Sequence, residues 1–158
     1  MKRRTIITTA ALAPLAACAG QTPSQIAADV VSDSQLIATG LSKELPVINN
    51  LTGIPSATLA KFLADLNSVI TIAQSITAEA AAVQAAPLIQ QIAGYIGNAL
   101  SIATTAPVNA LLPPGVLPVL EAANALLPVL MAAVGLVGSP EVPASMTPAA
   151  ARAILASA

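Results

Sequence analysis

Apolar side chains recur every three or four residues along most of the chain after residue 22, which is the spacing of one helix face. The first such stretch begins at Thr22, which can cap a helix, with Pro23 suited to the first helical position and Gln25 placed to complete a capping box. We expect this helix to end before Pro46, whose ring would collide with the carbonyl of Ser42. Its apolar face is predicted at Ile26, Val30, Ile37, Leu41 and Leu45.

Two further helices follow the same periodicity. A run without Gly or Pro predicts a helix from Ser56 to Ala86, and Pro87 opens a third. The second helix has a predicted core face of Leu59, Leu63, Leu66, Ile70, Ala73, Ile76, Ala80 and Val83, opposite a solvated face of Lys61, Asp65, Ser68, Ser75 and Glu79. The third has a core face of Ile89, Ile92, Ile96, Leu100 and Ala103.

The segment after residue 108 is more apolar and contains a short repeat. Asn109-Ala110-Leu111-Leu112-Pro113 recurs fifteen residues later as Asn124-Ala125-Leu126-Leu127-Pro128. A break is expected at 113–115, followed by a helix over 116–137 that is long enough to span a membrane. Glu121 and the prolines oppose insertion, so the sequence favours a buried central helix and leaves a membrane-inserting segment as the alternative. Buried there, Glu121 would need a cationic partner, and the cations of the body are Lys43, Lys61 and Arg152.

No stretch shows the sustained alternation of apolar and polar residues that predicts a strand. A Pro-containing loop is expected over 138–146, and Thr147 can cap a short last helix within 147–158. The predicted fold is therefore all-α, a bundle of four or five helices centred on residues 24–137.

Composition excludes several kinds of chemistry. Of the 158 residues 56% are apolar and 8% charged, with one Cys, one Tyr, one Phe, no Trp and no His. A His-based triad is therefore impossible, ligand sets for zinc are missing, and no basic face with stacking aromatics is present for nucleic acid. We expect no metal, no cofactor, no nucleic-acid partner and no catalytic residue.

Two pairs of polar residues are candidates for a site, and neither is expected to form one. Asp29 and Asp33 lie one helical turn apart and are interpreted as acids on a solvated face. Ser42 and Lys43 are adjacent, so in a helix they point in different directions and do not form a dyad by themselves. Neither pair predicts an enzyme.

The N-terminus has the layout of an export signal. Lys2, Arg3 and Arg4 precede an uncharged, mostly apolar stretch over 5–14 that is too short to span a membrane. This stretch leads into Leu15-Ala16-Ala17-Cys18, which resembles the lipobox of bacterial lipoproteins.

The resemblance implies that a signal peptidase recognises Leu15, Ala16 and Ala17, cleaves before Cys18, and leaves a diacylglycerol on the Cys18 thiol. Residues 1–17 would then be a removed signal peptide and 18–23 a lipidated tether. The alternative is an ordinary secretory signal cleaved after Ala17 or Ala19.

Cleavage would leave three basic residues against seven acidic ones, a net charge of −4, so electrostatics would not attract the body to anionic lipid. Ala19 follows the cysteine, where Asp would resemble an inner-membrane retention signal. In a Gram-negative host the expected location is therefore the periplasmic face of the outer membrane.

Three functional hypotheses follow from these patterns. The first is a lipid-anchored, non-enzymatic envelope protein that packs its helices against a partner protein or a second copy. The second is a membrane-active lipoprotein that inserts 116–137, resembling in outline the single-chain spanins of phages. The third is a carrier of an apolar ligand inside the bundle.

Overall fold

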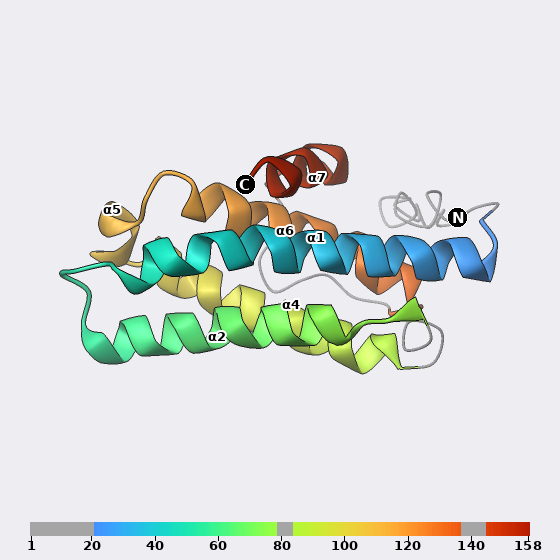
Figure 1. Cartoon of the computed structure of the whole chain (residues 1–158), viewed down its shortest axis with the longest axis horizontal. Helices are drawn as coiled ribbons and strands as arrows, with labels where there is room; N and C mark the ends of the chain where they lie inside the picture. The colour runs from blue at the N-terminus through green and yellow to red at the C-terminus, as the bar shows by residue number, and fades with distance from the viewer. Residues whose placement is uncertain (1–20, 79–83, 137–144) are drawn as a thin grey trace, which may run out of the picture.

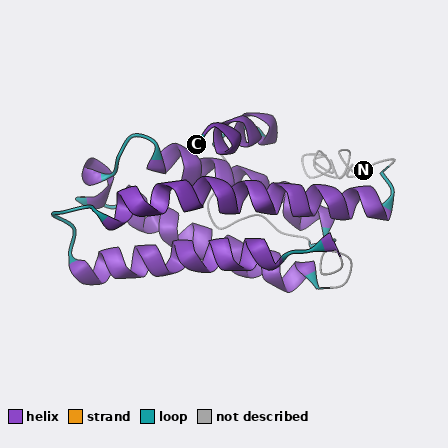
Figure 2. Cartoon of the chain, viewed as in Figure 1, coloured by secondary structure: helices purple, strands orange, loops and turns teal. Residues whose placement is uncertain are grey.

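The computed structural model describes residues 21–78, 84–136 and 145–158, and these residues form helices without any strand (Figure 2). The prediction of an all-α bundle is confirmed. The described helices are α1 (Pro23–Asn49), α2 (Ser56–Ser75), α4 (Ala85–Thr104), α5 (Val108–Leu111), α6 (Val116–Ala133) and α7 (Pro148–Ser157).

Four long helices, α1, α2, α4 and α6, lie lengthwise beside one another and alternate in direction along the chain (Figure 1). Helix α2 packs against α1 and α4, and α6 packs against α4 and α1, so the four helices enclose one core. This is the up-down arrangement of a four-helix bundle. The single-turn α5 follows α4 at one end of the bundle, while α7 packs on α6 and α1.

The core is aliphatic, and burying each Leu or Ile side chain contributes about 1.5–3 kcal/mol. Among the described residues only two large apolar side chains are exposed, Val47 at 44% and Leu111 at 39%. Most large apolar side chains of the described residues therefore lie inside the bundle. Its largest fully buried side chains are Phe62, Ile37, Leu41, Ile48, Leu66, Ile76, Ile89, Ile92, Ile96, Leu120, Leu126 and Leu127.

Helix α1 begins with the predicted capping box. The Gln25 N–H donates to Thr22 Oγ1 at 3.4 Å, and the Thr22 N–H donates to Gln25 Oε1 at 2.8 Å. Pro23 occupies the first turn, where its missing N–H has no helical partner to lose. These contacts fix the start of α1 at Pro23.

Thr22→Ala is expected to lower the free energy of unfolding by about 0.5–1 kcal/mol, because the first turn loses its side-chain acceptor. Thr52→Ala, in the exposed loop after α1, is the matched control and should change it by less than about 0.5 kcal/mol. Urea denaturation followed by circular dichroism measures both. Equal effects would contradict the role of the cap.

The prediction that the first helix ends before Pro46 is wrong, because α1 continues through Pro46 to Asn49. Pro46 lies in the last turn, so the ladder loses one hydrogen bond close to its end. The Asn50 side-chain amide donates to the Pro46 carbonyl at 2.8 Å and closes this turn. Ile48 is fully buried, and its burial offsets the cost of the proline.

The second predicted helix was expected to reach Ala86, but α2 ends at Ser75. Ile76 has an extended backbone (φ −76°, ψ 94°) and a buried side chain. The Ser75 hydroxyl donates to the Ile72 carbonyl at 2.7 Å, and branching at Cβ of Ile76 and Thr77 lowers helix propensity. Glu79, Ala80 and Val83 of the predicted faces lie outside the described residues.

The predicted break before the apolar helix is confirmed, since α5 ends at Leu111 and α6 begins at Val116. The predicted end of this apolar helix at 137 is wrong, because α6 ends at Ala133. Gly135 adopts φ 74° and its N–H donates to Ala132 O at 3.1 Å, while the Leu136 N–H donates to Met131 O at 2.8 Å. This is a Schellman cap, which glycine accepts without strain.

Among the described helices, α6 alone is long and apolar enough to cross a membrane, and 61% of it is buried in the bundle. The core helix of a water-soluble bundle passes the same test of length and composition. Within the bundle α6 packs against α4, α1 and α7, as a central helix does.

Candidate functional site

An ion pair, a close contact at a glycine and a lysine hydrogen bond lie together where α7 packs on α1 and α6. Thr147 caps α7 as predicted, accepting a hydrogen bond from the Ala150 N–H at 3.3 Å. The inner face of α7 buries Ala151 and Leu155, which join the core of the four long helices. We call the surface of α1 and α6 that α7 covers the α7 seat.

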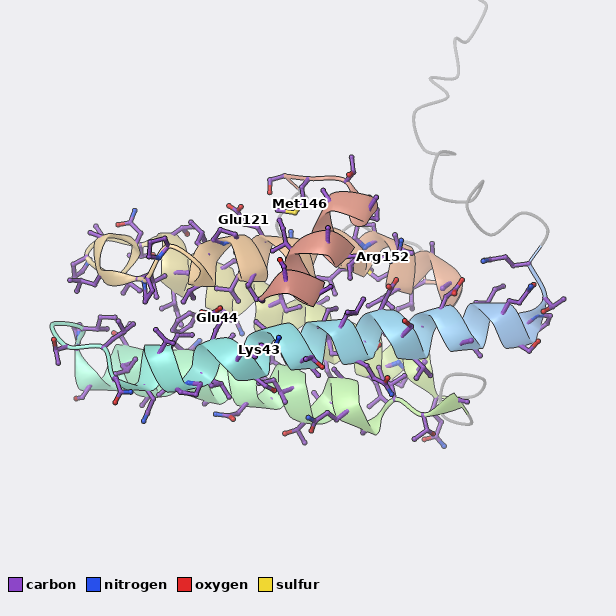
Figure 3. The ribbon with its side chains drawn as sticks, turned by 45° about the horizontal axis from the view of Figure 1, so that its top comes forward. Lys43, Glu44, Glu121, Met146 and Arg152 are labelled. Atoms are coloured by element: carbon purple, nitrogen blue, oxygen red, sulfur yellow. The ribbon has the colours of Figure 1, made fainter. Side chains whose placement is uncertain are left out.

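An ion pair links α7, which carries Arg152 (Figure 3), to Asp33 of α1 within this contact. Arg152 donates from Nε to Asp33 Oδ1 at 2.7 Å and from Nη2 to Asp33 Oδ2 at 2.6 Å. This is a bidentate pair, the strongest geometry for a guanidinium and a carboxylate. The hydrogen bond to Asp33 raises the pKa of Arg152, so the guanidinium stays protonated.

The interpretation of Asp33 as a solvated acid is therefore wrong, because this residue is only 3% exposed. Asp29 is exposed and accepts a hydrogen bond from Gln21 Nε2 at 2.8 Å, so the two carboxylates do not form one site. Ser34 beside Asp33 is fully buried, and its Oγ has no hydrogen-bond partner. Two buried polar residues, Asp33 and Ser34, therefore interrupt the apolar core face of α1 between Val30 and Ile37.

Gly40 allows α7 to approach α1 closely. A Cβ at this position would lie 2.8 Å from Leu155 Cδ2 and 3.6 Å from Leu155 Cα. Leu155 is 1% exposed, although its side chain also borders a pocket beside α1. The absence of a side chain at residue 40 therefore leaves the space that the tip of the Leu155 side chain occupies.

Lys43 of α1 (Figure 3) extends the contact past the end of α7, where its Nζ donates to the main-chain oxygen of Ala158. The neighbouring Ser42 hydroxyl donates to the Ala38 carbonyl at 2.6 Å. Ser42 and Lys43 thus have separate partners. This arrangement gives no support to a Ser/Lys catalytic dyad.

The expectation that Glu121 would pair with one of the body's cations is wrong. Glu121 is half-buried, and the three cations bond elsewhere: Arg152 to Asp33, Lys61 to Asp65 and Lys43 to Ala158. Because Glu121 is only partly buried on α6, its position does not require a cationic partner.

Glu44 lies instead at the start of α6. Its Oε1 is 3.5 Å from the position that a Cβ on Gly115 would occupy. Gly115 is the N-cap of α6, where a negative charge is favoured by the helix dipole. Glu44 therefore helps to seat the α6 N-terminus on α1.

Lys61 and Asp65 form an ion pair of 3.4 Å on α2. The assignment of Asp65 to a solvated face is wrong, because this residue is buried, whereas Lys61 is exposed. A pair with one exposed partner on a single helix contributes about 0.3–0.5 kcal/mol.

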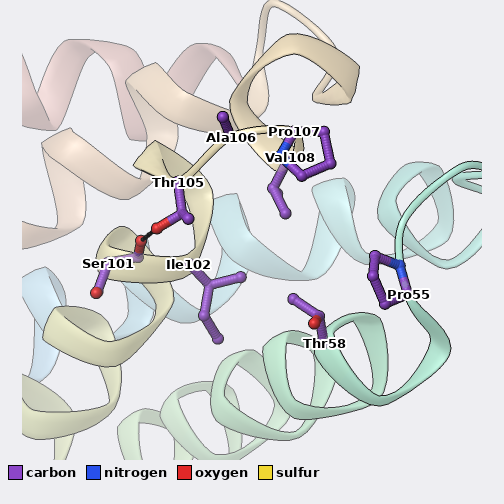
Figure 4. A pocket seen from close by; sticks show the side chains of 8 residues that line it. All are labelled: Pro55, Thr58, Ser101, Ile102, Thr105, Ala106, Pro107 and Val108. Carbon is purple, nitrogen blue, oxygen red and sulfur yellow. Dashed lines mark hydrogen bonds between the residues drawn. The ribbon is translucent and has the colours of Figure 1, made fainter.

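A shallow pocket of about 280 Å³ lies at the end of the bundle where α4 meets α5 and the start of α2 (Figure 4). The Thr105 hydroxyl in it already donates to the Ser101 carbonyl at 2.6 Å. None of its lining residues is charged. They are Pro55, Thr58, Ser101, Ile102, Thr105, Ala106, Pro107 and Val108.

The predicted lipidation site, Cys18, and the predicted peptidase-recognition residues, Leu15, Ala16 and Ala17, lie outside the described residues. Within the described residues no three His, Cys, Asp or Glu side chains gather as ligands for a metal ion. The fold defines the protein as an all-α helical bundle. No protein-family model, curated protein or solved structure matches the chain.

Proposed function

We propose that this protein is a lipid-anchored, non-enzymatic helical protein of the bacterial cell envelope, acting by helix packing against a partner protein or a second copy. The observation that carries the proposal is the lipobox-like Leu15-Ala16-Ala17-Cys18, with the only Cys of the chain at the modified position. A basic cluster and an apolar stretch precede it in the order that export signals require.

The arrangement of the bundle supports the proposal. Four residues separate Cys18 from Pro23, where helix α1 begins, so a lipid on Cys18 would lie close to the first turn. The apolar side chains of the described residues are largely buried, so the bundle itself has little need of a bilayer. A folded body with one lipid-modified residue would be a peripheral lipoprotein. In a Gram-negative host we place it on the periplasmic face of the outer membrane.

Membrane fractionation tests the proposal against insertion of α6. The test chain has residues 1–17 replaced by a signal that the general signal peptidase removes, and Cys18→Ser. The signal peptide has to be replaced because a chain with Cys18→Ser alone would keep an uncleaved, membrane-bound signal. The parent protein should sediment with membranes and the test chain should be soluble after carbonate extraction.

Retention of the test chain in carbonate-washed membranes would contradict the proposal and favour the spanin-like alternative. The parent protein, fractionated in parallel, is the control for recovery of membranes. A soluble test chain with a soluble parent would contradict the lipid anchor itself.

A further inference from the structure

The pocket at the end of the bundle is lined by side chains from three helices (Figure 4). Thr58 of α2 and Val108 of α5 point toward one another across it, and Ile102 of α4 lies beside them. Val108 is 3% exposed, and Ile102 packs against the core of the bundle. Packed helices therefore set the shape of the pocket, as in the largely preformed sites that bind small ligands.

The lining of this pocket has no charged side chain, and neither do the parts of the chain that supply it. The two stretches 45–60 and 80–120 contain no Asp, Glu, Lys or Arg. Transfer of an ion from water into such surroundings costs free energy that no opposite charge offsets. The pocket therefore favours uncharged molecules over charged ones.

One hydroxyl in the lining is available to a ligand. The Thr105 hydroxyl already donates to the Ser101 carbonyl at 2.6 Å. The Thr58 hydroxyl, in contrast, has no hydrogen-bond partner among the described residues. Thr58 is half-buried, so its hydroxyl lies next to apolar side chains. A single polar group in an apolar pocket fixes the orientation of a ligand that has one matching polar group.

An exposed leucine belongs to the elements that form the pocket. Leu111 ends α5, the helix that begins at Val108. Its Cδ1 lies 3.4 Å from the position that a Cβ on Gly53 would occupy, two residues before Pro55 of the lining. Leu111 is one of only two exposed large apolar side chains among the described residues. Exposed apolar surface close to a pocket is typical of a ligand-binding region.

We infer that this pocket binds a small uncharged molecule with an apolar body and one group that accepts a hydrogen bond from the Thr58 hydroxyl. Its volume of about 280 Å³ is close to the lower limit of ligand pockets, so the ligand has about the size of one substituted ring. The inference goes beyond the proposed function and does not depend on the lipid anchor, because all residues that carry it belong to the bundle.

Two probes of nearly the same shape test the inference: cyclohexanecarboxamide, which is neutral, and cyclohexanecarboxylate, which is an anion at neutral pH. Each is titrated into the isotope-labelled Cys18→Ser chain without its signal peptide, and the amide chemical shifts are followed by NMR. The carboxamide should shift the amides of Thr58, Ile102 and Val108 saturably, with a Kd of about 1 mM or tighter. The carboxylate should bind at least tenfold more weakly, because its charge has no partner in the pocket.

Variants of Thr58 test whether the probe occupies the pocket. Thr58→Phe fills the pocket from α2 and should weaken carboxamide binding at least tenfold, whereas Thr71→Phe, exposed on the same helix, is the matched control and should leave it unchanged. Thr58→Val keeps the shape of the side chain and removes the hydroxyl. It should weaken binding about threefold to tenfold, and it keeps the test decisive if Thr58→Phe does not fold.

A carboxamide that causes no saturable shift at the pocket would overturn the inference. Equal binding of the two probes would contradict the preference for uncharged molecules, and unchanged binding to Thr58→Val would contradict the role of the hydroxyl. Shifts centred on Val47 instead of the pocket would show adsorption to exposed apolar side chains and would also refute the site. The chain that is titrated has no lipid, so failure of the anchor leaves these outcomes unaffected.

Discussion

Leu126→Ala is expected to lower the free energy of unfolding by about 2–5 kcal/mol. Leu126 is fully buried in α6, which packs against α4, α1 and α7 at the centre of the bundle. Removing the side chain leaves a cavity that rigid neighbouring helices fill only in part. Urea denaturation of a Cys18→Ser chain without its signal peptide measures the loss.

Leu111→Ala is the matched control, because Leu111 occupies the same place in the first copy of the Asn-Ala-Leu-Leu-Pro repeat. It is 39% exposed, so its truncation should cost less than about 1 kcal/mol. Similar values for both variants would contradict the placement of α6 in the core. The comparison also distinguishes a buried α6 from one that unfolds independently of the bundle.

Arg152→Ala is expected to destabilise the bundle by about 2–3 kcal/mol. Removing one partner of a fully buried ion pair costs about 3–5 kcal/mol, because the other charge is left unpaired. Here the Arg152 side chain is 42% exposed whereas that of Asp33 is 5% exposed, so water can relieve part of the cost. Undocking of α7 sets the upper limit, since it returns Asp33 to solvent.

Amide hydrogen exchange shows which helices lose stability in Arg152→Ala. In Arg152→Ala the amides of α7 should exchange faster while those of α2 and α4 keep most of their protection. Lys61→Ala breaks the other described ion pair, which is a single contact of 3.4 Å to a more exposed cation, and should therefore cost less than Arg152→Ala. Equal effects of the two substitutions would contradict the assignment of Asp33–Arg152 as the contact that holds α7.

The helices could be predicted where the signal is local. Thr22 and Thr147 each act as the cap that the sequence indicates, and the apolar spacing of α4 predicted its buried face. The errors occur at helix ends, where tertiary contacts decide. Burial of Ile48 extends α1 past a proline, and burial of Ile76 ends α2 without Gly or Pro. Gly135 was a local signal for the end of α6, and the apolar run obscured it.

The α7 seat could not be predicted from spacing, because Asp33 and Arg152 are 119 residues apart. One signal was present: the apolar positions of α1 skip from Val30 to Ile37, and Asp33 fills the missing turn of that face. A charge on a core face requires a partner, and Arg152 lies in a helix otherwise without charge. The repeat was misleading, since Asn124 is buried and Asn109 exposed. Cys18, by contrast, is predicted as a lipidation site from its immediate neighbours alone.

Incorporation of labelled palmitate is the most direct test of the lipid anchor on which the proposed function depends. Bacteria producing the parent protein or Cys18→Ser are grown with the label, and Thr22→Ala, close by in the sequence, is the control. The parent and the control should be labelled, and Cys18→Ser should not. An unlabelled parent protein, or a Cys18→Ser chain that retains the label, would contradict lipidation at Cys18.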